Sequence, residues 1–206
     1  MGKFTEYIGS QFGNPRGIVG KICCIIMNVI NNKMYIKTVQ MISLPEKSRV
    51  LDIGYGNGYL LKLLDKSGKK YELYGIDISE DMKKKASKKN DKAFREGRLH
   101  LETGDCCAIS YENEFFSAVT SINTVYFWSD ISKGMSEIYR TLTQNGTFYN
   151  VVYTKEWLDK LSYTKKGFKK YDAKTLEKLS REAGFSDVEV HDIVKGRSFV
   201  VVCRKK

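Results

Sequence analysis

The sequence predicts an α/β fold: a seven-stranded, mostly parallel sheet with helices on both faces and a C-terminal antiparallel hairpin. Three observations predict it. From Arg49 onward, short apolar strands alternate with helical segments, which is the pattern of a parallel sheet covered by helices. A turn with three closely spaced glycines follows the first of these strands. The last two strands are joined by so short a turn that they must be antiparallel neighbours.

The strands are expected where short, mainly apolar runs end in glycine or polar residues. In chain order they cover residues 49–54, 71–79, 99–105, 115–123, 147–153, 188–196 and 198–206.

The helices are expected at residues 18–39, 58–68, 130–146 and 172–185, and in the lysine-rich segment after Ser79. The first has apolar residues on more than one side, so we expect it to be buried or to cover a ligand pocket. Ser79 is expected to cap the lysine-rich helix, which has two acidic residues in its first turn. Asn145 and Gly146 form a helix-stop signal after the fourth helix.

The chain of 206 residues fits one domain with room for a sizeable core. Its formal net charge is +11, which favours contact with phosphates. However, the two lysine-rich runs, residues 83–89 and 165–170, are far apart in the sequence, and each is more typical of a solvated face. The apolar run at residues 22–30 is too short to span a membrane.

The five cysteines show neither the spacing of a metal site nor that of a disulfide framework. Four of them sit in two adjacent pairs, Cys23–Cys24 and Cys106–Cys107, and Cys203 stands alone. Reduced thiols in a cytoplasmic protein without a bound metal are therefore the simplest expectation.

The glycine-rich turn lies where an open α/β sheet binds its ligand, at the carboxyl ends of the strands. Gly54 and Gly56 allow the backbone to bend and the ligand to approach, and Gly58 allows the next helix to start close to the strand. The spacing is G-x-G-x-G, one residue shorter than the dinucleotide fingerprint. It therefore favours a compact ligand without a pyrophosphate.

Two acidic residues follow the next two strands. Asp77 comes about 20 residues after the loop, where a carboxylate accepts both hydroxyls of a ribose. Asp105 follows the third strand, where it is suited to the exocyclic amine of an adenine, with the N–H of Cys106 donating to the ring. Together with the loop, they describe a nucleoside site.

The chain resembles the class I S-adenosylmethionine-dependent methyltransferases, most closely the small bacterial and archaeal ones. The resemblance covers roughly residues 49–153 and lies in "VLDIGYGNGYLL", "YGIDIS", "TGDCC", "SAVTSINTVYFWSD" and "EIYRTLTQNGTF". It implies a Rossmann-like fold, with S-adenosylmethionine as the cofactor and S-adenosylhomocysteine as the product. Tyr55 departs from the Cys, Ala or Ser that many relatives carry in the loop.

The resemblance also implies the cofactor-binding residues. Asp52 would hold the amino group of the methionine moiety, the loop would line the cofactor, and the two later acids would take ribose and adenine. The implied set is Asp52, Gly54, Tyr55, Gly56, Gly58, Asp77, Ile78, Asp105, Cys106 and Asn123.

We expect the substrate pocket to be formed by aromatic residues beside the reactive methyl group: Tyr7, Phe12, Tyr126, Trp128 and Tyr153. Residues 1–45 would form an arm and helix that cover the active site of a methyltransferase domain at 46–206, and residues 155–171 would supply another wall. The alternative is that the N-terminal helix, Phe127 and Trp128 serve only in packing.

The expected function is methyl transfer to a small-molecule acceptor by in-line displacement, in which the protein mainly positions the reactants. No catalytic residue is identified, because His100 and His191 lie within expected strands. The alternatives are methylation of RNA or protein, a cofactor-binding protein without activity, or a nicotinamide oxidoreductase. The sequence contains no [DNS]-P-P-[YFW] signature of nucleic-acid N-methylation, since "NTVY" stands in its place.

Overall fold

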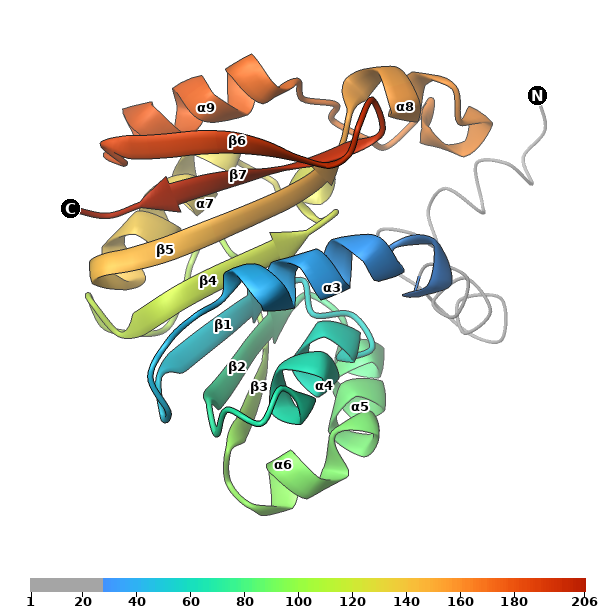
Figure 1. Cartoon of the computed structure of the whole chain (residues 1–206). Coiled ribbons are helices and arrows are strands. Elements are labelled where there is room, and N and C mark those ends of the chain that lie inside the picture. Colours follow the sequence, from blue (N-terminus) through green and yellow to red (C-terminus); the bar gives the residue numbers. More distant parts are fainter. Residues whose placement is uncertain (1–27) are drawn as a thin grey trace.

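The computed structural model describes residues 28–206. Its centre is a seven-stranded sheet of order β3-β2-β1-β4-β5-β7-β6 (Figure 1). In this sheet only β7 runs antiparallel to its neighbours β5 and β6, so the predicted mixed sheet with a closing hairpin is confirmed. The strands are β1 Arg49–Ile53, β2 Glu72–Asp77, β3 Leu99–Thr103, β4 Phe116–Ile122, β5 Leu142–Tyr153, β6 Asp187–Val194 and β7 Ser198–Arg204.

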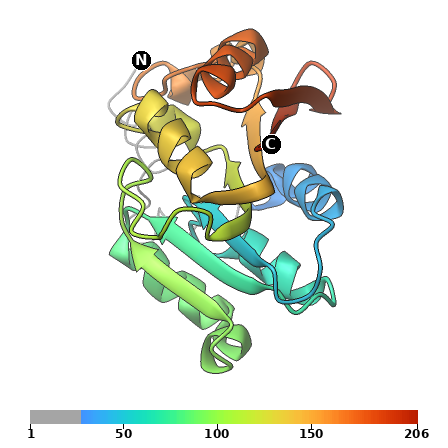
Figure 2. The same cartoon turned by 90° about the vertical axis from the view of Figure 1, so that its left-hand side faces the viewer.

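Helices cover both faces of the sheet (Figures 1 and 2). Adjacent residues of β5 mark the two faces: the Tyr149 hydroxyl donates to the carbonyl of Met41 at the end of α3, whereas the Phe148 ring stacks near Phe185 after α9. The helices are α3 Asn32–Met41, α4 Tyr59–Lys66, α5 Glu80–Lys89, α6 Asp91–Arg95, α7 Ile131–Thr141, α8 Lys155–Asp159 and α9 Ala173–Glu182, with 3-10 turns η1 Val125–Phe127 and η2 Ser162–Thr164.

The central strands have nearly continuous apolar sequences because both faces of the sheet are covered by helices. Val50 and Leu51, adjacent in β1, are both fully buried although their side chains point to opposite faces. Helix α4 shows the complementary pattern: Leu60, Leu61 and Leu64 are buried, and the residues between them are partly exposed. The predicted apolar runs therefore become the core of one domain.

The winding of the sheet reverses at β1. The chain passes from β1 to β2 and β3 on one side, and then returns to β4 and β5 on the other. The connections that leave the carboxyl ends of β1 and β4 therefore run to opposite sides, and a crevice forms between these loops. The glycine-rich loop after β1 lies at this switch point.

The prediction of a helix over residues 130–146 was wrong at its end. Helix α7 stops at Thr141, and Leu142 already pairs with Phe116 as the first residue of β5. The register then shifts, because residues 143–146 bulge out of the ladder. Asn145 has a φ of 63°, and its N–H donates to the carbonyl of Lys205 at 2.8 Å. The Asn-Gly pair thus marks a strand bulge, which requires the same left-handed backbone as a helix stop.

Ser79 occupies the N-cap position of α5 as predicted, but its side chain makes no capping hydrogen bond. Instead, the backbone N–H of Ser79 donates to Oδ1 of Asp77 at 2.9 Å. The predicted helix at residues 18–39 is described only from residue 28, and α3 extends it to Met41. The rest of that prediction lies outside the described residues.

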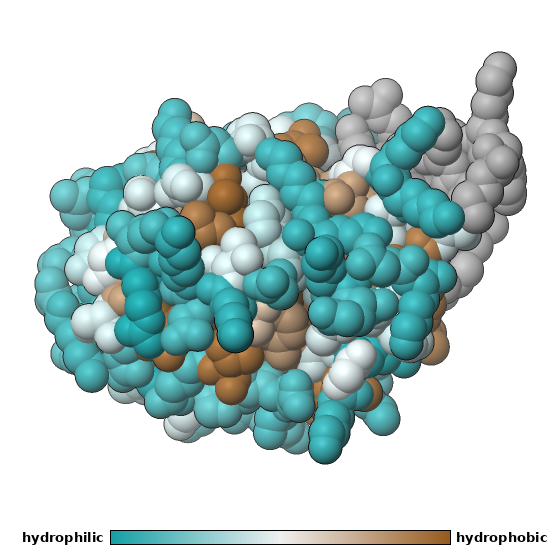
Figure 3. Space-filling model, turned by 90° about the horizontal axis from the view of Figure 1, so that it is seen from above, coloured by the Kyte–Doolittle hydropathy of each residue, from teal (hydrophilic) through white to brown (hydrophobic). Residues whose placement is uncertain are grey.

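The surface viewed from above in Figure 1 is mostly hydrophilic, with small, separate hydrophobic areas (Figure 3). In the described part of the chain, no helix is long and apolar enough to cross a membrane.

Candidate functional site

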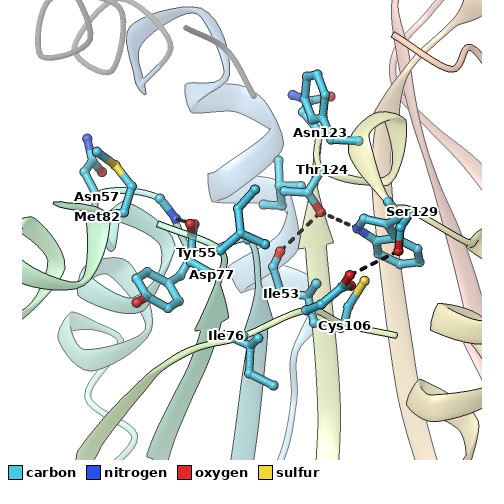
Figure 4. A pocket seen from close by; sticks show the side chains of 18 of the residues that line it. Ile53, Tyr55, Asn57, Ile76, Asp77, Met82, Cys106, Asn123, Thr124 and Ser129 are labelled. Carbon is cyan, nitrogen blue, oxygen red and sulfur yellow. Dashed lines mark hydrogen bonds between the residues drawn. The ribbon is translucent and has the colours of Figure 1, made fainter. Parts of the chain in front are cut away.

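A cavity of about 240 Å³ opens at the switch point of the sheet. It is enclosed by the loops that follow β1, β2, β3 and β4, and by α3 (Figure 4). Most of the predicted cofactor-binding residues meet here. Those that line it are Gly54, Tyr55, Gly56, Asp77, Ile78, Asp105, Cys106 and Asn123, together with Trp128.

The glycine-rich loop needs its glycines for two physical reasons. Gly54 has a φ of +68°, and a Cβ atom there would lie 2.4 Å from Cγ2 of Thr124. A side chain at Gly54 would therefore break the contact between the loop and the end of β4. At Gly56 the space is open, so the backbone itself faces the cavity.

Asp77 ties the loop to the end of β2. Its carboxylate accepts hydrogen bonds from the N–H of Gly56 at 2.8 Å and from the N–H of Ser79 at 2.9 Å. Burial raises the pKa of Asp77, and these two bonds counteract the rise. A carboxylate has about four acceptor positions, so about two remain for the hydroxyls of a ribose.

Asp52 lies in β1 with only 4% of its surface exposed. The Thr120 hydroxyl donates to Oδ1 of Asp52 at 2.9 Å. Burial raises the pKa of Asp52 to about 7, against the lowering effect of Thr120, and the negative charge of Asp77 adds to the rise. Asp52 does not line the cavity among the residues described, so its predicted contact with the cofactor stays a prediction.

Gly58 is also outside the lining of this cavity. It is the left-handed N-cap residue of α4, and a Cβ atom there would lie 2.6 Å from Nδ2 of Asn90 and 2.9 Å from Cβ of Ala86. Gly58 therefore permits the close approach of α4 to α5, as expected for the third glycine of such a loop.

Asp105 is held at the opposite end of the cavity. Its carboxylate accepts from the N–H of Cys107 at 2.9 Å and from the Ser129 hydroxyl at 3.1 Å. The Cys107 N–H is the main reason that the pKa of Asp105 is lowered. Asp105 therefore stays ionised at neutral pH and is a good acceptor for an exocyclic amine.

Ligand atoms of Asp105, Cys106 and Cys107 lie within 4.8 Å of one another, which is the geometry of a potential metal site. However, burial raises the pKa of the Cys106 thiol, and the Cys107 thiol hydrogen-bonds to the Asp130 carbonyl at 3.1 Å. Metal binding requires the thiolate. The arrangement therefore favours a neutral Cys106 thiol in the lining of the cavity.

Tyr55 fits the loop because of a glycine in the neighbouring strand. Its ring lies over Gly75, where a Cβ atom would come within 2.5 Å of Cδ1 of Tyr55. Its hydroxyl donates to the carbonyl of Glu102 at 3.2 Å. The side chain is thus directed across β2 toward β3, which explains how the loop accepts a residue larger than the Cys, Ala or Ser of many relatives.

A second cavity, of about 40 Å³, adjoins the first. Tyr126 and Tyr153 line it, whereas Trp128 lies in the larger cavity, where its indole N–H donates to the Thr124 hydroxyl at 3.2 Å. The segment after β5 supplies another wall, in the region where the sequence predicted one. The wall residues from that segment are Leu158, Leu161, Tyr163, Thr164 and Phe168.

Asn123 and Phe127 line both cavities. Asn123 has a φ of 59°, and its N–H donates to the carbonyl of Val151 at 2.8 Å. Its Oδ1 accepts from the Tyr126 hydroxyl at 3.0 Å. Asn123 is therefore held firmly at the boundary between the two spaces.

Met82 and Ser129 were not singled out from the sequence, and Tyr35 was included only in the helix expected to cover the site, although all three line the larger cavity. Met82 had a signal, because it is the one large apolar residue among the polar residues of the α5 sequence. The predicted residues Tyr7 and Phe12 lie outside the described residues. His191 is exposed on β6 and hydrogen-bonds to Glu189, and His100 stacks on Tyr74 away from the cavity.

These features suit S-adenosylmethionine. The cavity joins an open glycine backbone, a carboxylate with free acceptor positions and a second, ionised carboxylate at the opposite end. Residues 51–150 match the sequence model of a family described as "Methyltransferase domain". Residues 51–150 are therefore a methyltransferase domain, in agreement with the resemblance of the sequence to the class I S-adenosylmethionine-dependent methyltransferases. S-adenosylmethionine is accordingly the cofactor of this domain.

Two of the individual proteins that match this chain share less than a third of their aligned residues with it. The uncharacterized methyltransferase YdaC of Bacillus subtilis is 29% identical over 121 residues, which are 59% of this chain and 65% of YdaC. A demethylmenaquinone methyltransferase of Bacteroides fragilis is 24% identical over 145 residues, which are 70% of this chain and 59% of that enzyme. The chain thus spans less than two thirds of the length of these curated relatives.

The fold is also shared with a solved S-adenosylmethionine-dependent methyltransferase from Aquifex aeolicus. The TM-score is 0.71 at 22% identity, and the match covers 85% of this chain and 93% of that one. At this identity the match establishes the arrangement of the chain and leaves the acceptor open.

Proposed function

We propose that this protein transfers the methyl group of S-adenosylmethionine to a small-molecule acceptor. When bound, the cofactor supplies a methyl group activated by a positively charged sulfonium. The observation that carries the proposal is the pair of adjoining cavities, one suited to the cofactor and one too small and too apolar for a polymer backbone. The family match and the resemblance of the loop support the same activity.

The residues of the larger cavity act by binding and orientation. Asp77 would hold the ribose, Asp105 with Cys106 would hold the adenine, and the backbone at Gly54 and Gly56 would line the methionine part. Holding reactants in line and excluding water supplies much of the acceleration in such a reaction. A dedicated acid or base is therefore not required for an acceptor that is already nucleophilic.

A small-molecule acceptor is also favoured by the demethylmenaquinone methyltransferases among the relatives. Their sequence identity to this chain is low. They therefore support a small molecule as the class of acceptor, and they do not specify its chemical structure. An RNA acceptor would need an extended basic surface beside the cavity. The net charge of +11 is the feature that favours it.

The test is calorimetric titration of the full chain with S-adenosylhomocysteine. We expect binding by the parent protein, and a loss of at least about tenfold in affinity for Asp77→Ala, because the ribose hydroxyls lose a charged acceptor. Asp81→Ala is the matched control, since Asp81 is an exposed carboxylate in the first turn of α5. An unchanged affinity in Asp77→Ala, or no binding by the parent, would contradict the proposal.

A further inference from the structure

The smaller cavity beside Asn123 has a lining that restricts which molecules it can hold. Among the residues described, no Asp, Glu, Lys, Arg or His side chain faces it. Aromatic walls come from Tyr126, Tyr153 and Phe168, and apolar walls from Leu158 and Leu161. An ammonium group placed there would lose its hydration without gaining a carboxylate partner.

Two of the three tyrosines in this lining, Tyr126 and Tyr153, have hydroxyls that are already engaged, and burial raises the pKa of the third, Tyr163. The Tyr126 hydroxyl donates to Oδ1 of Asn123 at 3.0 Å and accepts from the N–H of Tyr153 at 2.7 Å. The Tyr153 hydroxyl donates to Oδ1 of Asn31 at 2.5 Å. Burial raises the pKa of both phenols. Neither hydroxyl can remove a proton from an acceptor at neutral pH.

The described charges around these walls include two cations and the Lys170–Asp159 ion pair, whose atoms lie 2.8 Å apart. The guanidinium of Arg197 lies 5.6 Å from the centre of the Tyr153 ring and 4.6 Å from that of Trp157. The ammonium of Lys169 donates to the carbonyls of Trp128 and Ser129 at 2.9 and 3.0 Å. These cations add to the cost of placing a protonated amine beside the same walls.

The cavity is also small. At about 40 Å³ it holds a group of a few heavy atoms, whereas a cavity that binds benzene has about 150 Å³. Because Asn123 and Phe127 line both cavities, a group that fills the smaller one lies directly beside the cofactor space. The reacting end of the acceptor is therefore compact and apolar.

We propose that the smaller cavity binds the sulfhydryl end of an apolar thiol, and that this protein methylates sulfur. This inference rests on the proposed function. A thiol has a pKa of about 8.5 and ionises in part without a protein base, whereas an alkylamine is protonated near neutral pH. The proton leaves to solvent, and the thiolate electron pair forms the new carbon–sulfur bond. As it forms, the bond from the methyl carbon to the sulfonium sulfur breaks, and its electron pair stays on that sulfur.

The first experiment compares acceptors of matched size with methyl-labelled cofactor, after subtraction of the reaction without protein. The probes are ethanethiol, ethylamine and ethanol, which share one skeleton, and phenol, which adds a ring. We expect ethanethiol to be methylated at least about tenfold faster than the other three, because only the thiolate is both small and accessible without a base. Faster methylation of ethylamine, ethanol or phenol would overturn the inference.

The second experiment measures binding without turnover. Ethanethiol is titrated by calorimetry into the full chain saturated with S-adenosylhomocysteine. Leu161→Phe, which fills the smaller cavity, should weaken ethanethiol binding about tenfold and change the affinity for S-adenosylhomocysteine less than about twofold. Leu44→Phe is the matched control, since Leu44 is half-buried and lies outside both cavities.

The outcomes separate the two proposals. If S-adenosylhomocysteine binds but ethanethiol neither binds nor is methylated, the thiol inference is overturned and the cofactor site stands. If S-adenosylhomocysteine does not bind, both are overturned. Equal weakening of ethanethiol binding by Leu161→Phe and Leu44→Phe would also overturn the assignment of the smaller cavity.

Discussion

Two carboxylates near the switch point show how strongly the position of a side chain in the fold affects its hydrogen bonding and its ionisation. Asp77 is held by two backbone N–H groups at the end of β2, whereas Asp52 is buried in β1 with the Thr120 hydroxyl as its hydrogen-bond donor. A buried carboxylate with so little compensation resists ionisation, and the nearby charge of Asp77 adds to this resistance. Asp52 therefore affects the stability of the protein as well as its predicted contact with the cofactor.

The pH dependence of this effect has a definite sign. With a pKa raised from 3.8 to about 7, folded Asp52 binds more protons than unfolded Asp52 across that interval. The free energy of unfolding therefore falls as pH rises from about 4 to 7. Asp52→Asn removes this dependence, so the variant should gain about 2.5 kcal/mol relative to the parent protein between pH 5 and pH 8.

Urea unfolding of both proteins at the two pH values measures this gain. Asp192→Asn, at an exposed carboxylate on β6, serves as the control and should show no such gain. If the stability difference between Asp52→Asn and the parent were the same at pH 5 and pH 8, the buried carboxylate would not be the source of the pH dependence.

At the level of elements, the sequence predicted the strands well because both faces of the central strands are covered, which leaves clear apolar runs. The error at residues 142–146 has a physical cause. Asn145 and Gly146 favour a left-handed backbone, and this local preference serves a helix stop and a strand bulge equally. The contact that decides between them, from Asn145 to the carbonyl of Lys205, comes from the far end of the chain.

Two glycines of the loop allow its effect on stability to be tested separately from its effect on cofactor binding. Gly56 and Gly58 both have positive φ, and alanine costs about 1–2 kcal/mol in that conformation. At Gly58 the added Cβ also meets Asn90 and Ala86 across the contact between α4 and α5. We therefore expect Gly58→Ala to lose about 1–3 kcal/mol more stability than Gly56→Ala.

The two variants should rank in the opposite order when the loss of affinity for S-adenosylhomocysteine is measured. Gly56 lines the larger cavity, so Gly56→Ala should weaken S-adenosylhomocysteine binding more than Gly58→Ala does. Urea unfolding and calorimetry on both variants give the two rankings. If one variant were worse by both measurements, stability and binding would not be divided between the two glycines in this way.

For the whole molecule, the sequence predicts the cofactor site better than the acceptor site. The cofactor-binding residues follow successive strands, so their order along the chain reflects their order along the sheet edge. The smaller cavity combines residues near α3, residues after β4 and the segment after β5, and no short motif links them. Only the folded chain brings Asn31, Asn123 and Tyr163 to the same cavity.

Ligand binding should be measurable as stability of the whole domain. A ligand at about 100 times its dissociation constant adds about 2.7 kcal/mol to the free energy of unfolding. For a chain of 206 residues this corresponds to a rise in Tm of about 5–10 °C. We expect S-adenosylhomocysteine to give this rise in thermal unfolding of the full chain.

The control that distinguishes a methyltransferase site from a dinucleotide site is NAD. It is added at the same multiple of a dissociation constant typical of dinucleotide-binding proteins. The loop of this chain is one residue shorter than the dinucleotide fingerprint, and the residues needed to hold two phosphates are not provided by Gly54–Gly58. NAD should therefore leave Tm unchanged. A rise with NAD equal to that with S-adenosylhomocysteine would indicate that the cavity recognises an adenosine alone, and that Asp77 and Asp105 act without any selection for the methionine end of the cofactor.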